Sequence, residues 1–168
     1  YPQSDRQCLG WLGMHGSYES NMAMHHADLI IAIGARFDDR VTNSTSKFCP
    51  TAKIIHVDVD PSSISKTVRA DVPIVGPASS VINEMISLVQ GHKIAHPEAL
   101  TEWWEKIDGW RADREGKLYE PSKPGEALKP QEVIEALCRV TRGEAYVTTD
   151  VGQHQMFAAQ YYKFDKPN

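Results

Sequence analysis

The fold is decided by the stretch Leu29-Ile30-Ile31-Ala32-Ile33-Gly34-Ala35-Arg36-Phe37-Asp38-Asp39-Arg40. Its first five residues form an unbroken apolar run, and a second run, Ile54-Ile55-His56-Val57, leads into Asp58-Val59-Asp60-Pro61. A short apolar run bounded by turn residues predicts a strand of a parallel sheet, buried on both faces. Ligands of open α/β sheets bind outside the carboxyl ends of such strands, so the polar residues after each run predict a nucleotide-type site.

The composition is that of an ordinary globular protein. The chain has 168 residues, of which 41% are hydrophobic and 24% charged, and its formal net charge is -4. No basic cluster indicates nucleic-acid binding, and no apolar run approaches the roughly 20 residues of a membrane helix. The three cysteines, Cys8, Cys49 and Cys138, are too widely spaced to predict a disulfide framework or a metal site, so reduced thiols in the cytoplasm are expected. The chain begins without an initiator Met or a signal segment and ends in a loop-like stretch, which predicts a fragment of a longer protein.

The first half of the chain predicts alternating strands and helices, and therefore a parallel sheet with right-handed crossovers. A short helix is expected over 21–27 and a strand over 53–59. Asp60 and Pro61 suit the N-cap and first position of a helix. A third strand over 72–75 and a helix over 78–90, capped by Gly91, complete the series.

The second half predicts a separate domain. Trp103, Trp104, Ile107 and Trp110 lie at near-helical spacing within 97–116, which indicates an amphipathic helix. Prolines mark 120–130 as a linker. A helix over 131–140 and a buried strand, Tyr146 to Thr149, are expected to follow, and a second polar cluster, Asp150 to Gln155, comes after that strand.

The residues after the first strand, together with a glycine-rich segment before it, have the chemistry of a phosphate site. Gly13-Met14-His15-Gly16 precedes the short helix, whose free amides suit an anion. Gly34-Ala35-Arg36 permits close approach of the backbone to a ligand, and Arg36 can pair with a phosphate. A plain turn with surface charges is the alternative, because a lone glycine-rich turn is a weak signal.

The other candidates divide between ligand contacts and structural roles. Asp58 can accept hydrogen bonds from ribose hydroxyls, whereas Asp60 fits helix capping better. Asp38 and Asp39 lie between two arginines, where ion pairs are more common than catalysis. The histidines lack the spacing of metal ligands, so no metal site is predicted. Gly152, Gln153 and His154 open a predicted helix and can hold a diphosphate.

Together these motifs resemble the catalytic large subunit of acetohydroxyacid synthase, also called acetolactate synthase. The resemblance rests on Leu12 to Gly16, Ala27 to Val41, Ile55 to Pro61 and Thr149 to Met156, and it is greatest to the bacterial isozyme III form. It implies an α/β fold: a Rossmann-like parallel sheet flanked by helices, as in the middle domain of a thiamine-diphosphate enzyme, plus the start of a second α/β domain.

The resemblance also implies domains and cofactors. Residues 1–95 correspond to the later part of a central FAD-binding domain, 96–128 to a helix and linker, and 129–168 to the start of the thiamine-diphosphate domain. The implied FAD contacts are Gly13, Met14, His15, Gly16, Gly34, Ala35, Arg36, Asp58, Asp60, Ile64 and Gly76. Gly152, Gln153 and His154 correspond to the diphosphate segment. Asp39 and Arg40 resemble residues near the active-site entrance, and Pro77 replaces an aspartate common in the family, which bears on the adenine contact.

The whole enzyme of this family condenses pyruvate with pyruvate or 2-ketobutyrate, with decarboxylation, in branched-chain amino-acid synthesis. Its cofactors are FAD, thiamine diphosphate and Mg²⁺, and a fragment like this one would hold the last two only partly or not at all. Its partners are further catalytic subunits, as a homodimer or tetramer, and a regulatory small subunit. No catalytic residue of the family falls in this chain, so the fragment alone is expected to be inactive. Two alternatives stay open: a related thiamine-diphosphate enzyme whose middle domain binds another nucleotide or none, and a scaffold module without a ligand.

Overall fold

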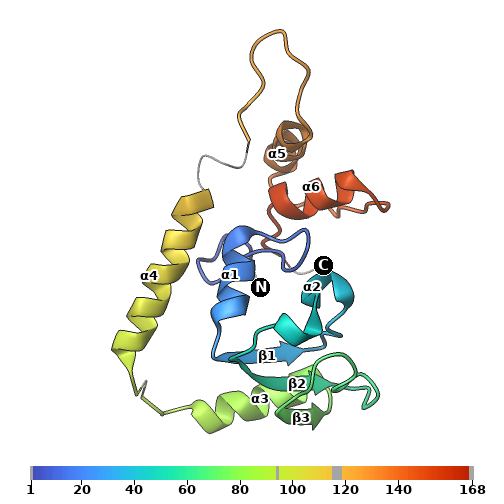
Figure 1. Ribbon diagram of the computed structural model, residues 1–168. Helices are drawn as coiled ribbons and strands as arrows, with labels where there is room; N and C mark the ends of the chain where they lie inside the picture. Colours follow the sequence, from blue (N-terminus) through green and yellow to red (C-terminus); the bar gives the residue numbers. More distant parts are fainter. Residues whose placement is uncertain (1, 94, 115–118, 167–168) are drawn as a thin grey trace. The chain divides into compact units, whose positions relative to one another are not determined.

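The computed structural model describes residues 2–93, 95–114 and 119–166, which form two compact units. Unit 2 is the continuous segment 22–108, and unit 1 combines residues 1–21 with 109–168. The boundaries fall within two helices, α1 (Tyr18–His26) and α4 (Pro97–Arg114) (Figure 1). The end of the helix expected over 97–116 lies outside the described residues.

Unit 2 contains the predicted parallel sheet. Its strands are β1 (Leu29–Ile33), β2 (Lys53–Asp58) and β3 (Val72–Val75), in the order β1-β2-β3. The register pairs Ile31 with Ile55 and Val57 with Ile74. A short helix, α2 (Asp39–Thr42), and a 3₁₀ turn, η1 (Thr45–Lys47), connect β1 to β2, and α3 (Ala78–Val89) follows β3 (Figure 1). The expected α/β class, with a parallel sheet flanked by helices, is confirmed.

One face of the sheet carries the core of unit 2. Ala32 and Ile54 are buried there against Phe37, which lies in the loop after β1. The partly buried Ile30, Phe48 and Val68 complete this cluster. The loop that connects β1 to β2 therefore covers this face of the sheet, and in doing so it fixes the position of the residues just after β1.

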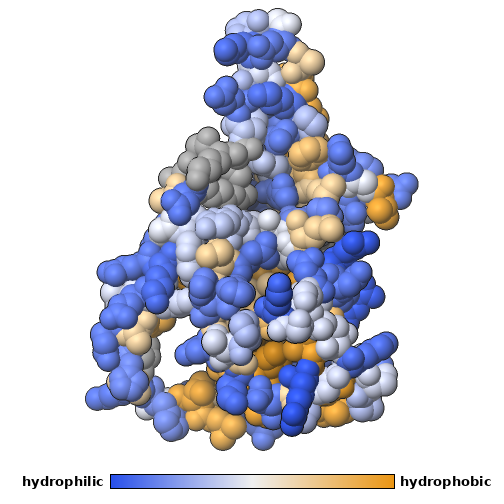
Figure 2. Space-filling model, viewed as in Figure 1, coloured by the Kyte–Doolittle hydropathy of each residue, from blue (hydrophilic) through white to orange (hydrophobic). Residues whose placement is uncertain are grey.

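The opposite face of β1 is open, which corrects the expectation that both faces are buried. Leu29, Ile31 and Ile33 stay 38–47% exposed, because α3 packs along β2 rather than along this edge strand. Figure 2 shows apolar side chains gathered over β1 and α3. The exposed residues of α3 include Ile86, Leu88 and Val89.

The helix expected to start at Asp60 and Pro61 does not form. Residues 61–68 make successive turns instead. The Asp60 carboxylate accepts hydrogen bonds from the Ser62 amide and hydroxyl, at 2.9 and 2.8 Å, which closes a local turn that competes with a helix. Ser65 then takes a positive φ of 60°, which interrupts helical geometry.

Unit 1 contains α5 (Pro130–Thr141) and α6 (Gln153–Tyr161), which pack together. The predicted linker, 120–130, is irregular, and the Ser122 amide attaches it to α5 by donating to Glu132 Oε1 at 3.2 Å. Just before the linker, the Tyr119 hydroxyl donates to Glu135 Oε2 at 2.7 Å. The strand expected over 146–149 is wrong: these residues are irregular, and Tyr146 is 86% exposed. A strand needs a neighbour to pair with, and the described part of unit 1 contains no strand.

Candidate functional site

The carboxyl edge of the sheet brings three predicted residues together. Gly34 follows β1, and its amide donates to the carbonyl of Val57 at 2.9 Å. Gly76 follows β3, and its amide donates to the carbonyl of Asp58, also at 2.9 Å. The backbone ladder thus continues past the strands and places Gly34, Asp58 and Gly76 side by side, where a ligand of an open α/β sheet is expected.

Gly34 leaves room for a ligand at this edge. It takes a positive φ of 63°, which favours glycine, and no atom lies within 4 Å of where a Cβ would stand. The next residue, Ala35, is fixed because its carbonyl accepts a 2.8 Å hydrogen bond from Nε2 of the buried His56. The Phe37 ring packs edge-on against the same imidazole, with centroids 5.0 Å apart.

Asp58 is the last residue of β2, at the carboxyl edge of the sheet. Its side chain is half-buried, and its Oδ1 accepts the Asp60 amide at 2.9 Å. Two hydrogen bonds from Ser62, of which the backbone bond is the stronger influence, keep the pKa of Asp60 below its usual value. Asp60 is therefore occupied as a turn-forming residue, and Ile64 lies half-buried in the turns that follow.

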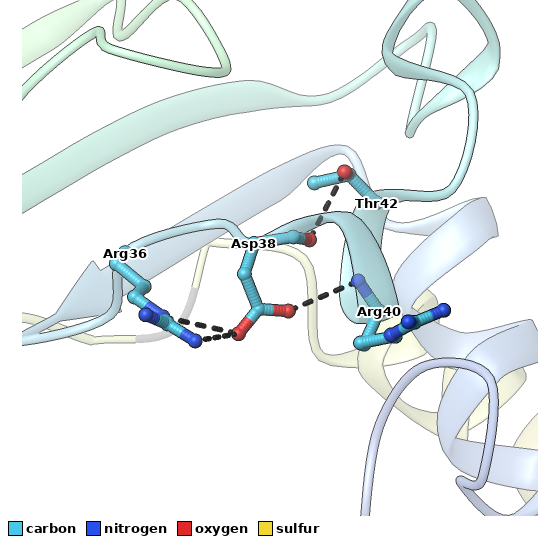
Figure 3. Close-up of polar contacts among 4 residues, drawn as sticks. All are labelled: Arg36, Asp38, Arg40 and Thr42. Atoms are coloured by element: carbon cyan, nitrogen blue, oxygen red, sulfur yellow. Dashed lines mark hydrogen bonds and ion pairs between the residues drawn. The ribbon is translucent and has the colours of Figure 1, made fainter.

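Arg36 and Asp38 form the ion pair that the charge pattern predicted. Nε and an Nη of Arg36 donate to Asp38 Oδ2 at 3.1 and 3.0 Å (Figure 3). The other oxygen, Oδ1, accepts the Arg40 amide and caps α2. The Arg36 hydrogen bond is the main reason that the pKa of Asp38 is lowered. The Arg36 side chain is 80% exposed, so a phosphate would compete with Asp38 for it at the surface.

The glycine-rich segment, Gly13 to Gly16, lies in unit 1 as part of a tightly folded loop over residues 9–16. Gly13 has a positive φ of 89°. A Cβ on Gly16 would stand only 2.4 Å from the carbonyl oxygen of Trp11, so glycine is required there by close approach. Met14 is 54% exposed and His15 is exposed, which leaves their side chains accessible to a ligand.

Three residues of the following segment hold this loop, and the sequence did not reveal them. Ser17 Oγ donates to the carbonyl of Leu9 at 2.8 Å, and Ser20 Oγ donates to that of Trp11 at 2.5 Å. Asn21 pairs with both backbone groups of Gly13: its Oδ1 accepts the amide at 2.8 Å, and its Nδ2 donates to the carbonyl at 2.9 Å. The polar residues at the start of α1 were the available signal, because such side chains commonly bind nearby backbone.

The predicted diphosphate segment forms the start of α6. Gly152 is the N-cap, and its φ of 158° and ψ of -170° fall in a region essentially restricted to glycine. Gln153 and His154 occupy the first turn and are exposed. Because Gly152 has no side chain to cap the helix, no side chain at the N-cap occupies the first amides of α6, and such amides can bind an anion.

Other site types find less support. Among the residues that the structure describes, no three His, Cys, Asp or Glu side chains gather as a metal site. All three cysteines are free, and burial raises the pKa of Cys49 to about 11. No helix in the described ranges has the length and apolar character to cross a membrane.

Comparison with known proteins agrees with this geometry. A family described as "Thiamine pyrophosphate enzyme, central domain" matches residues 1–85. This chain belongs to the thiamine pyrophosphate enzyme family. The match to this central domain covers the glycine-rich segment and all three strands of the sheet. Gly152, Gln153 and His154 lie beyond it.

Individual relatives refine the comparison within the thiamine pyrophosphate enzymes. The chain is 55% identical over 168 residues to the acetolactate synthase isozyme 3 large subunit of Escherichia coli, and 51% identical over 167 residues to the acetolactate synthase large subunit of Haemophilus influenzae. It is also 43% identical over 167 residues to acetolactate synthase of Mycobacterium bovis. In each case 99% of this chain is covered. The chain spans 27–29% of the length of these relatives.

Proposed function

We propose that this chain is part of an acetolactate synthase large subunit, in which residues 1–95 form the later part of an FAD-binding central domain. Residues 96–128 would connect it to the start of a thiamine-diphosphate domain at 129–168. The observation that carries the proposal is the juxtaposition of Gly34, Asp58 and Gly76 at the carboxyl edge of the sheet. The identity to acetolactate synthase subunits supports the choice of activity.

The chain's own residues fit a dinucleotide. Gly34 leaves open space against the backbone, and Asp58 Oδ1 is the only one of its two carboxylate oxygens with a hydrogen bond among the described residues. The second oxygen would accept a ribose hydroxyl, and Gly13 to Gly16, Ala35, Arg36 and Ile64 would contact other parts of FAD. Pro77 supplies no carboxylate beside Gly76, so the adenine would rely on backbone and apolar contacts there.

The start of α6 fits a diphosphate. Gly152, Gln153 and His154 would hold the phosphates of thiamine diphosphate through backbone amides and side-chain donors. Thiamine diphosphate supplies the chemistry that allows pyruvate to lose CO₂ and join a second keto acid. The described residues contain no clustered metal ligands, so the Mg²⁺ that neutralises the diphosphate would be held by other parts of the subunit.

The intact assembly would be a cytoplasmic homodimer or tetramer of catalytic subunits with a regulatory small subunit. The name of the Escherichia coli relative, a large subunit, supports a smaller partner. Pyruvate and 2-ketobutyrate would be the substrates. FAD would serve structure rather than redox chemistry, because the condensation involves no net oxidation.

A chimera tests the proposal. Residues 1–168 replace the matching segment of the Escherichia coli large subunit, and in a second chimera they replace that of the Haemophilus influenzae subunit, so that a folding failure in one host does not decide the outcome. We expect both chimeras to purify with flavin and to form acetolactate from pyruvate. The isolated chain is expected to form none. A folded chimera that binds FAD but makes no acetolactate would contradict the activity, and an active chimera that neither retains nor needs flavin would contradict the FAD site.

Substitution at the carboxyl edge tests the site itself. Asp58→Ala removes a charged acceptor, and we expect FAD to bind about tenfold or more weakly in the chimera. Asp113→Ala, at an exposed position of α4, is the matched control. Unchanged FAD affinity in Asp58→Ala would contradict the ribose role. A chimera that binds ADP but not FAD would favour the alternative, a thiamine-diphosphate enzyme whose central domain takes another nucleotide.

A further inference from the structure

A long-range hydrogen bond joins the two segments to which different cofactors are assigned. Gln160, in the last turn of α6, donates from Nε2 to the carbonyl of His15 at 2.8 Å. The two residues are 145 positions apart in the sequence, and both belong to unit 1. The glycine-rich loop is thus attached directly to the helix whose first turn faces the proposed diphosphate.

The surroundings show that this bond is part of a continuous contact. A cavity of about 110 Å³ lies between the loop and α6, and its lining includes Gly10, Trp11, Ser17, Ala159, Gln160 and Lys163. Beyond α6, Gln3 pairs with both backbone groups of Phe164 through its own amide and its side-chain oxygen, at 3.1 and 3.3 Å. Of these contacts, the Gln160 bond is the one that reaches the segment between Gly13 and Gly16.

We propose that Gln160 is a positioning residue that couples the two cofactor sites by holding the His15 carbonyl against α6. This inference rests on the proposed function. Gly152 and Gln160 are eight residues apart, about 12 Å along a helix, which is a rigid connection. A diphosphate bound at the first turn would restrain the movement of α6, and through the Gln160 hydrogen bond it would restrain the His15 carbonyl as well. The flavin would then bind a loop that loses less conformational freedom on binding.

The chemistry of the side chain is specific. A carbonyl oxygen only accepts, so position 160 must donate, and the Gln160 amide does so from its nitrogen. A glutamate at this position would have nearly the same shape but would place an acceptor against an acceptor. A lysine differs in shape but keeps a donor. The pair Gln160→Glu and Gln160→Lys therefore separates the loss of the hydrogen bond from a change in packing.

The experiment measures FAD affinity by flavin fluorescence in the chimera, with and without saturating thiamine diphosphate and Mg²⁺. We expect thiamine diphosphate to tighten FAD binding by about fivefold or more, within the usual range of coupling between sites. Gln160→Glu is expected to reduce this factor below about twofold, whereas Gln160→Lys keeps part of it. Gln131→Glu, at a half-buried glutamine of α5, is the control and should leave the factor unchanged.

The reciprocal titration adds a second readout. Coupling between binding sites is symmetrical, so FAD must tighten thiamine diphosphate by the same factor, measured by calorimetry. If both cofactors bind the unsubstituted chimera without affecting each other, or if Gln160→Glu keeps the full coupling, the inference is wrong while the proposed function stands. If neither cofactor binds, the proposed function itself fails. Unchanged affinity of each variant for thiamine diphosphate in the absence of FAD shows that α6 still folds, and a variant that keeps this affinity but not the coupling supports the positioning role.

Discussion

The imidazole of His56 and the carbonyl of Ala35 are joined by a hydrogen bond of 2.8 Å that spans 21 residues of sequence. A carbonyl accepts only, so Nε2 of His56 carries the proton. His56 is 1% exposed, and its Nδ1 has no hydrogen-bond partner among the described residues. The hydrogen bond thus connects β2 to the backbone of the loop after β1. It does so at Ala35, next to Gly34, where the proposed ligand would bind.

Replacing His56 by leucine should destabilise unit 2. The Ala35 carbonyl loses its donor, and an unsatisfied buried polar group costs about 1–3 kcal/mol. Urea unfolding of the 168-residue chain measures the difference. His92→Leu, at an exposed histidine after α3, should change the free energy of unfolding far less. Equal effects of the two substitutions would mean that the His56 bond contributes nothing to stability.

Two glycine substitutions should have opposite effects. Gly16→Ala forces a Cβ against the Trp11 carbonyl, and overpacking of this kind costs about 1–3 kcal/mol. Gly109→Ala, within α4 and with open space around it, should stabilise that helix by about 0.5–1 kcal/mol. Thermal unfolding of the two variants gives the comparison. A neutral Gly16→Ala would show that the loop from Trp11 to Gly16 shifts freely.

Stability should fall at acidic pH partly through Asp38. Its pKa is lowered in the fold, first by the Arg36 hydrogen bond, so its stabilising effect is complete above the unfolded pKa of about 3.9 and is lost as the pH falls through the lower folded value. Asp38→Ser keeps a capping oxygen for the Arg40 amide but removes this titration. Melting temperatures measured from neutral to strongly acidic pH should therefore fall less steeply for Asp38→Ser. Parallel curves would assign the acid sensitivity to other carboxylates.

The hydrogen bond between Tyr119 and Glu135 should be lost only at strongly alkaline pH. The hydrogen bond to Glu135 is the main cause that raises the pKa of Tyr119 to about 12. Stability from this bond is fully present below the unfolded tyrosine pKa of about 10 and is lost as the pH rises through the folded value. The tyrosinate absorbance of the chain minus that of Tyr119→Phe reports this titration. The same subtraction is then made in the Glu135→Gln background, with and without Tyr119→Phe. Its midpoint should lie nearer the ordinary tyrosine pKa of about 10, and an unchanged midpoint would show that Glu135 does not raise the pKa of Tyr119.

The sheet could be predicted well from the sequence, whereas the contacts that hold the loops could not. β1 and β3 have the predicted bounds, because continuous apolar runs between turn residues are a local signal. The segment from Tyr146 to Thr149 is also rich in residues that favour strands, yet it forms no strand where no described neighbour pairs with it. Asp60 is a residue type that favours both helix N-caps and turns. Here its carboxylate accepts two hydrogen bonds from Ser62, and these form a turn in place of a helix.

The supporting residues were hidden for a different reason. Asn21 and Gln160 act on backbone groups 8 and 145 positions away, and no periodicity encodes such a bond. His56 gave a partial signal, since a polar residue within an apolar strand needs a partner when buried. The sequence indicated candidate ligand contacts, which stay a prediction, whereas the residues that hold those segments in position emerged from the three-dimensional contacts.

The pairing of Gln3 and Ser4 with Phe164 and Asp165 has a consequence for synthesis on the ribosome. Both pairs span 161 residues, so unit 1 cannot close until residues 164–165 have left the exit tunnel. Unit 2 is one continuous segment that ends at Asp108. Its parallel sheet can therefore form during synthesis, before the second segment of unit 1 has been made. Unit 1 thus begins first in the sequence but is completed second.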